Sequence, residues 1–426
     1  MLNTAGLSLE QAPPIGVPFV FFLSAPWFAV VAGLMLAWLG PDILLTRWAP
    51  SSLAAAHLLG LGFLGLITIG ALFQLLPVLA GAAVPRAVGV SRTAYGLLVP
   101  GIAMLVAGFW TSSTGLQLVA LAPVGSGVLI LVIALGLALR RASAASEIVR
   151  VIELAIGGLL LAAGLGATIV LALNARVGLM LLPAWVDLHL SWALLGWAGL
   201  LLVGIGTQLV PLFHVTPPYP AWFRGAAPTV LFVALLGATA GHIGDDARLR
   251  VLGVAAALAV LATFAVLTLQ LQAARRRPVW DPTLSFWWLG MACLLGAVAA
   301  WLADAPGTTL GVLVLAGVAV AVPSGVLYKV APFLAWFHLQ AEQMAQGRWD
   351  VAVPHMKSFV GDRAAHAHFA LHAAALLLLL AALAGWDAVA RPAGVLFTAA
   401  SVVQGVNLLR VYLRFRAVRR LLARPV

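Results

Sequence analysis

Charged residues are scarce in this chain of 426 residues: Asp, Glu, Lys and Arg make up 9% of it, and hydrophobic residues make up 63%. Ordinary soluble domains carry about 25% charged residues. The 24 Lys and Arg and 13 Asp and Glu residues are too few to cover a water-soluble protein of this length. The scarcity excludes a soluble enzyme, a nucleic-acid-binding domain and a disordered chain, and it predicts that the lipid bilayer is the main partner.

Cysteine is also nearly absent, because Cys293 is the only one and lies inside an apolar run. This excludes an internal disulfide and a cysteine-ligated zinc or iron–sulfur site. The first 17 residues contain Glu10 but no Lys or Arg, so they lack the basic n-region of a signal peptide. We expect the first apolar stretch to be retained as a membrane span.

Long apolar runs fill most of the chain. At about 20 residues per span, they predict an all-α polytopic membrane protein of about twelve transmembrane helices. We treat residues 1–426 as a single transmembrane domain, and residues 339–365 as the longest cytoplasmic loop. The predicted spans are 18–40, 53–80, 93–111, 117–139, 151–173, 187–214, 227–242, 250–272, 283–303, 308–337, 366–386 and 393–413.

The basic residues predict the orientation of these spans. Most of the 24 Lys and Arg residues fall in one set of alternate loops and in the C-terminal tail. Cytoplasmic loops carry an excess of Lys and Arg, so we expect both termini on the cytoplasmic side of the cell inner membrane.

An internal repeat of four residues marks the second, sixth and tenth predicted spans. The spacing Gly-x7-Gly-x3-polar-x2-Pro occurs three times, at Gly62–Gly70–Gln74–Pro77, Gly196–Gly204–Gln208–Pro211 and Gly317–Gly325–Lys329–Pro332. At about 100° per residue, the four positions share an arc of about 120° on one helix face. Glycines on such a face allow neighbouring helices to approach closely. The repeat therefore predicts three pseudo-equivalent four-helix units.

The second span carries a resemblance to two known families. It reads HLLGLGFLGLITIGALFQLLPVLAGAAVPR from His57 to Arg86. With the repeat, this resembles subunit I of the haem–copper oxidases, whose motif positions would be His57, Gln74, Pro77, Gly81, Pro85 and Arg86. The segments HLLGLGF and GALFQLLPVLAG are also similar to the NnrS family of haem- and copper-containing membrane proteins. The resemblance implies an oxidase-like twelve-helix fold and a haem ligand at His57.

The chain departs from the oxidase pattern in its histidines. The tenth span has no His-x-His, and only His338 stands at its predicted inner end. No His-His pair follows on the seventh span. We therefore expect the oxygen-reducing site to be absent, and the sequence leaves open whether the chain is an enzyme.

Nine histidines supply candidate ligands for a b-type haem or for copper, because neutral imidazole binds both metals well. His57 and His189 begin two repeat-related spans, and we expect them to bind the cofactor or to be ordinary interfacial residues. On the eleventh span, His368 and His372 are four residues apart and share a helix face. The predicted metal group on the inner side comprises His366, His368, His372, His338 and His214.

Lys329 is the only lysine inside a predicted span. An intramembrane charge costs about 2.5–3.5 kcal/mol on insertion scales, so such residues usually snorkel to the surface or serve a function. As a functional group, Lys329 would complete a polar ring with Gln74 and Gln208 near the inner mouth of a threefold axis.

These patterns favour a membrane protein that binds haem, copper or both in redox or nitric-oxide-related physiology, alongside respiratory or nitric-oxide-related membrane proteins. A secondary transporter or channel, with Lys329, Gln74 and Gln208 on its path, is one alternative. An accessory or assembly protein of a respiratory complex is another. The sequence gives neither the haem type nor the ligand pairing, the substrate or the oligomeric state.

Overall fold

The computed structural model describes residues 12–142, 147–178, 182–277 and 279–424. In these ranges the chain is almost entirely helical and has no strand. Twelve helical stretches are long and apolar enough to cross a membrane, which confirms the predicted all-α polytopic fold. Residues 1–11, including Glu10 and most of the segment judged not to be a signal peptide, lie outside the described ranges.

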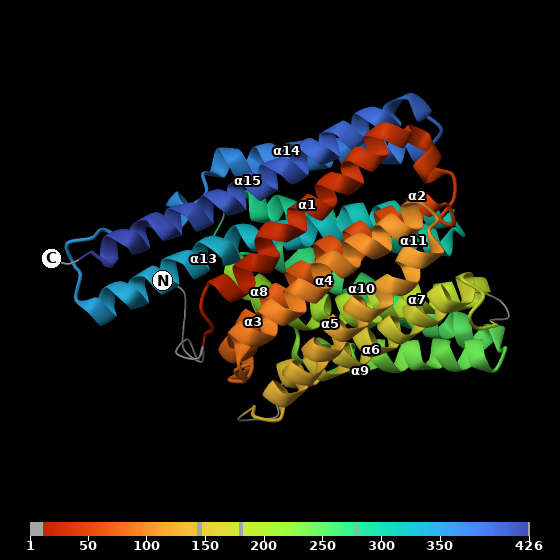
Figure 1. The fold of residues 1–426 in the computed structure, drawn as a ribbon, viewed down its shortest axis with the longest axis horizontal. Coiled ribbons are helices and arrows are strands. Elements are labelled where there is room, and N and C mark those ends of the chain that lie inside the picture. Colours follow the sequence, from red (N-terminus) through yellow and green to blue (C-terminus); the bar gives the residue numbers. More distant parts are fainter. Residues whose placement is uncertain (1–11, 143–146, 179–181, 278, 425–426) are drawn as a thin grey trace. The chain divides into compact units, whose positions relative to one another are not determined.

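The helices follow one another along the chain, and the longest connection is that between α13 and α14 (Figure 1). In chain order the α-helices are α1 (Gly16–Leu39), α2 (Pro50–His57), α3 (Leu66–Ala80), α4 (Ala87–Trp110), α5 (Thr114–Leu139), α6 (Glu147–Leu173), α7 (Leu182–Ser191), α8 (Leu200–His214), α9 (Ala221–Ile243), α10 (Ala247–Ala273), α11 (Pro282–Leu302), α12 (Gly307–Gly311), α13 (Val320–Gln346), α14 (Asp362–Leu383) and α15 (Ala390–Leu422).

Three spans widen into a π-helical segment of eight residues each. These segments are η3 (Leu58–Gly65), η4 (Trp192–Gly199) and η5 (Val312–Ala319). They join α2 to α3, α7 to α8 and α12 to α13, so they lie in the second, sixth and tenth spans, which carry the sequence repeat. π-Helical turns are rare and are frequent at functional sites.

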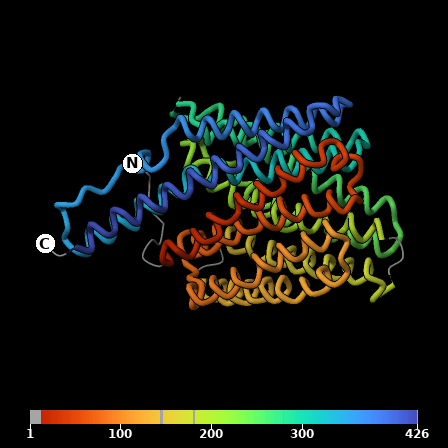
Figure 2. The backbone as a smooth tube through the Cα atoms, turned by 45° about the horizontal axis from the view of Figure 1, so that its top comes forward, coloured from red at the N-terminus to blue at the C-terminus, as the bar shows by residue number. Residues whose placement is uncertain are grey.

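The chain forms two compact units, and each is described by itself. One unit comprises Pro14–Ala71 and Val279–Val426 and is called the histidine unit below. In it, α1 lies along α15, and α14 packs beside α15, as both backbone views show (Figures 1 and 2). Helix α11 packs on η5 and α13, and η3 packs on α1.

The other unit, Leu72–Pro278, is called the central unit. It contains two antiparallel hairpins, α4 with α5 and α9 with α10. Helix α6 packs against α7, η4 and α8, so the sixth span is covered along its length by the helix that precedes it.

The repeat glycines let each of these three spans approach the preceding helix closely, as their spacing predicts. A Cβ added to Gly204 would lie 2.3 Å from Cγ1 of Val151, and one added to Gly158 would lie 2.1 Å from the carbonyl oxygen of Gly196. Each of the three spans has such contacts with the helix before it: Gly62 with Phe28 and Gly70 with Phe22, Gly204 with Val151 and the Gly196 backbone with Gly158, and Gly317 with Cys293 and Gly325 with Phe286. The pairing therefore repeats with a period of four helices. The grouping into three four-helix units stays a prediction, because the compact units number two.

Two helices continue beyond their predicted ends. Helix α13 runs to Gln346, so the connection expected over 339–365 begins at Gly347, whose backbone φ of 64° ends the helix. Helix α15 runs to Leu422 rather than to residue 413. Glu342 and Arg419 form an ion pair of 3.0 Å between these extensions. The ion pair joins the two polar helix extensions to each other.

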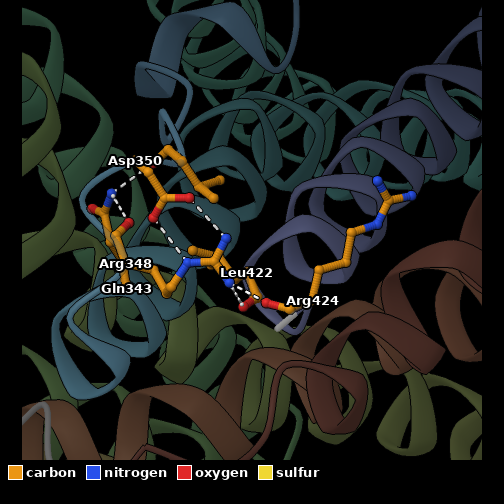
Figure 3. A network of polar contacts seen from close by, with 6 residues as sticks. Gln343, Arg348, Asp350, Leu422 and Arg424 are labelled. Carbon is orange, nitrogen blue, oxygen red and sulfur yellow. Dashed lines mark hydrogen bonds and ion pairs between the residues drawn. The ribbon is translucent and has the colours of Figure 1, made fainter. Parts of the chain in front are cut away.

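A second polar network holds the same two ends together (Figure 3). Arg348 forms a bidentate pair with Asp350, with both N–O distances at 2.8 Å, and also donates to the carbonyl oxygens of Leu422 and Arg424. The side chain of Gln343 donates to the carbonyl oxygen of Val351 at 2.7 Å. Hydrogen bonding to Arg348 lowers the pKa of the Asp350 carboxyl below its usual value. The network joins the residues after α13 to the end of α15.

Candidate functional site

Polar side chains gather in the interior of the histidine unit, where α13, α14 and α15 meet. All are at least nine-tenths buried: Ser324, Tyr328, His368, His372, Ser401, Gln404 and Asn407. Polar groups inside a membrane are costly and are by default functional. This group is called the polar core below and is our candidate site.

One chain of hydrogen bonds in the polar core fixes the protonation of His368. Asn407 Nδ2 lies 3.3 Å from the carbonyl oxygen of Ala364 and 3.0 Å from the Tyr328 hydroxyl. The carbonyl can only accept, so this contact orients the amide with its NH₂ toward Tyr328. Tyr328 accepts from Asn407, and its own proton must go to His368 Nδ1, 3.0 Å away, because a buried hydroxyl proton without an acceptor is costly. His368 therefore carries its proton on Nε2.

His372, one helical turn away, has the opposite arrangement. It is 1% exposed, and its ring lies against the backbone of Ala316 in η5. Its Nε2 has no hydrogen-bond partner among the described residues, so we infer that Nδ1 faces the carbonyl oxygen of Ala316. A carbonyl oxygen accepts, so Nδ1 carries the proton. His372 Nε2 is left as a buried nitrogen with a free lone pair.

Aromatic rings enclose the two histidines. The His368 and His372 ring centroids are 6.3 Å apart, and the Phe286 ring lies 4.8 Å from His368 and 6.0 Å from His372. Phe397 lies 5.8 Å from His372 on its α15 side. The site therefore offers one donor (His368 Nε2–H) and one acceptor (His372 Nε2) within a largely apolar surrounding.

A further pair of polar residues lies on the same helices. Gln404 Nε2 donates to Ser324 Oγ at 3.0 Å, while Gln404 Oε1 is buried with no partner among the described residues. The polar core thus holds two unsatisfied acceptor atoms, Gln404 Oε1 and His372 Nε2.

Of the predicted inner metal group, the structure brings His368 and His372 together. His366, on the same helix, is exposed and bonds through Nδ1 to the carbonyl oxygen of Asp362 at 2.8 Å. His338 bonds to the carbonyl oxygen of Leu334 at 2.9 Å. His214 belongs to the central unit, where it is buried 3.0 Å from Gln272 Nε2. Within the described ranges, no three His, Cys, Asp or Glu residues form a group that could hold a metal ion.

His57 and His189 belong to different units, so their pairing around one cofactor stays a prediction. Each half-buried ring bonds through Nδ1 to a backbone carbonyl, His57 to Leu53 at 2.8 Å and His189 to Ala162 at 2.9 Å. The two residues stand beside the π-helical segments η3 and η4. Metal-ligating histidines commonly make such a bond through the ring nitrogen that does not bind the metal.

The three residues of the predicted polar ring have different surroundings. Lys329 forms an ion pair with Asp281, 2.5 Å away, and Asp281 also accepts from the backbone N–H of Leu284 at the start of α11. Gln74 is buried, and neither polar atom of its amide has a partner among the described residues. Gln208 is half-buried. Because Gln74 and Gln208 lie in the central unit and Lys329 in the histidine unit, the ring itself stays a prediction.

Sequence reasoning missed Tyr328, Asn407, Ser324 and Gln404. Each is polar within an otherwise apolar span, and Gln404 and Asn407 share a face of α15 at three-residue spacing. That spacing was a usable signal for α15. Nothing in the sequence pairs Asn407 with Tyr328, which lies 79 residues earlier.

The central unit has its own buried tyrosine, outside the spans. The Tyr219 hydroxyl lies 2.6 Å from Thr268 Oγ1, and its ring stacks on Phe264. Burial raises the pKa of Tyr219 well above its usual value, so it stays protonated.

The comparison with protein-family models gave no match, and neither did the comparison with curated protein sequences. Fold and composition define the class: this is a multi-pass membrane protein, with twelve helices in its described ranges that are long and apolar enough to cross a membrane and with a buried histidine-containing polar core.

Proposed function

We propose that this chain binds a b-type haem or copper within the cytoplasmic membrane, in redox or nitric-oxide-related physiology, with both termini on the cytoplasmic side. The observation that carries the proposal is His372 Nε2, a buried imidazole nitrogen whose lone pair has no partner among the described residues. An unpaired polar atom inside a membrane is costly, and a metal would satisfy it.

The surroundings of His372 suit a ligand. The inferred contact of its Nδ1–H with the backbone of Ala316 would be the outer bond that orients metal-ligating histidines and raises their basicity. Tyr328 and Asn407 keep the proton of His368 on Nε2, so His368 acts as a hydrogen-bond donor beside the site. When bound, the metal would supply one-electron chemistry or bind a small molecule.

The experiment compares two histidines of α14. Full-length protein, produced with haem precursor and copper supplied, is purified, and its absorption spectrum and its copper and iron content are measured. We expect His372→Ala to lower the bound metal at least about tenfold, and His366→Ala to leave it unchanged, because His366 is exposed. His372→Gln, with a melting curve for each variant, separates ligand loss from misfolding. Wild-type protein without haem or copper would refute the proposal, as would full metal content in His372→Ala.

Gln74 favours a second candidate function, a transporter or channel. Its amide is 4% exposed with neither polar atom bonded among the described residues, as expected of a residue that meets water or a solute on a path. Proton flux into proteoliposomes, followed with a pH-sensitive dye, tests this. Proton flux that is lost in Gln74→Leu but kept in Gln117→Leu would support a transporter or channel. Absence of flux in the wild type would count against this function.

A further inference from the structure

The end of α15 carries arginines on two different sides of the helix. Arg419 pairs with Glu342 of α13, and Arg414 donates to the carbonyl oxygen of Ser358 and lies over the Phe359 ring. These two are held by the protein itself. Arg416 and Arg420 are exposed, and no carboxylate in the described part of the chain pairs with either. The guanidinium carbon of Arg416 lies over the ring of Tyr412, 6.0 Å from its centroid.

Arg416 and Arg420 continue the lipid-facing stripe of the helix. Leu409 and Leu413 are 41% and 52% exposed, as expected of side chains in contact with lipid. At about 100° per residue, both leucines and both arginines fall within an arc of about 60°. The opposite side of α15 stays buried to its end, through Val411, Phe415, Val418 and Leu422. The arginines therefore point away from the protein.

The change from exposed leucines to arginines along this stripe is the pattern expected where a helix leaves the hydrocarbon core. Arg416 lies about 5 Å and Arg420 about 10 Å beyond Leu413 along the helix axis. The headgroup layer on each side of the hydrocarbon core is about 5 to 8 Å thick. We therefore expect both guanidinium groups to reach the depth of the lipid phosphates, aided by their long flexible side chains.

We propose that Arg416 and Arg420 form a binding site for the phosphate of an anionic phospholipid. The guanidinium group matches phosphate in charge and in its paired donors. Each arginine near an anionic surface contributes about fivefold to binding, so the pair contributes about 30-fold. The site stands apart from the polar core and does not depend on the proposed metal.

The experiment titrates delipidated full-length protein in neutral detergent with dioleoyl phosphatidylglycerol and, separately, with dioleoyl phosphatidylcholine. Native mass spectrometry counts the bound lipids. The test variant is Arg416→Gln with Arg420→Gln. The control is Lys357→Gln with Arg363→Gln, which removes the same charge from exposed positions at the same end of the unit.

We expect the test variant to bind phosphatidylglycerol about 30-fold more weakly and the control to stay within about twofold of wild type. Phosphatidylcholine should bind weakly to all three proteins. An equal loss in the control would mean general electrostatic attraction and would overturn the proposal. So would unchanged binding in the test variant, or displacement of phosphatidylglycerol by millimolar inorganic phosphate, which would show that free phosphate is the ligand.

Discussion

The sixth and tenth spans share one frame but surround different side chains. Both carry a π-helical segment and glycines that admit the preceding helix. At η4 the facing residue on α9 is Thr239, which accepts from Trp192 Nε1 at 3.0 Å and itself bonds to a backbone carbonyl. At η5 the facing residue on α14 is His372, which lies against the backbone of Ala316 and whose Nε2 has no partner among the described residues. The same helix arrangement therefore surrounds a fully hydrogen-bonded threonine in the central unit. In the histidine unit it surrounds a histidine whose Nε2 has no partner among the described residues.

The largest expected effect comes from filling the helix contact of the sixth span. In Gly158→Ala the new Cβ would lie 2.1 Å from the backbone oxygen of Gly196, which cannot move aside, so we expect a loss of about 3 kcal/mol or the loss of folded protein. In Gly317→Ala the new Cβ meets the Cys293 side chain at 2.7 Å. Cys293 can turn away, so we expect about half that loss.

Gly164→Ala is the control for both, since nothing lies within 4 Å of its added Cβ. Unfolding of the purified variants in detergent, followed by circular dichroism, gives the order of their stabilities. Equal stability of Gly158→Ala and Gly164→Ala would contradict the glycine-mediated contact.

A smaller effect separates the two buried tyrosines. Tyr328→Phe removes the bridge between Asn407 and His368, and we expect a loss of about 2 kcal/mol because two buried groups lose a partner. Tyr219→Phe should cost about 1 kcal/mol, because Thr268 keeps its bond to the carbonyl oxygen of Phe264. Melting curves measure both, and a larger loss for Tyr219→Phe would reverse the comparison.

The smallest effect concerns pH at the ends of α13 and α15. The folded-state pKa of Asp350 is lowered by hydrogen bonding to Arg348, so its contribution is fully present above the ordinary carboxyl pKa of 3.8. The contribution is lost as the pH falls through the lowered folded-state pKa. We expect a spin label at Leu421→Cys, in a Cys293→Ser background, to become more mobile over that acid range. In the Asp350→Asn variant the label should already be mobile at neutral pH. Identical pH profiles of label mobility in the two proteins would disprove the link between Asp350 and the end of α15.

Hydropathy alone predicted all twelve spans, since lipid demands a continuous apolar helix. It missed the ends of α13 and α15 because those turns are polar and depend on a contact between Glu342 and Arg419, 77 residues apart. The repeat predicted that the second, sixth and tenth spans approach neighbouring helices closely, because residues without bulky side chains permit such contacts.

The site was predictable only in part. The four-residue spacing placed His368 and His372 on one buried face, since spacing within a helix determines its faces. The opposite proton positions of the two rings depend on Tyr328, Asn407 and Ala316, which reach them from other helices. Likewise, the partner of Lys329 is Asp281, 48 residues earlier, and no local pattern predicts that pair.

The free lone pair of His372 is the central claim, and its tautomer tests it most directly. Nitrogen-15 NMR of histidine-labelled, metal-free protein in lipid bilayers distinguishes a protonated ring nitrogen from a bare one, and the His368→Gln and His372→Gln variants assign the signals. We predict that His372 is protonated on Nδ1 with Nε2 bare, and that His368 is protonated on Nε2. A His372 ring protonated on Nε2 would contradict the account.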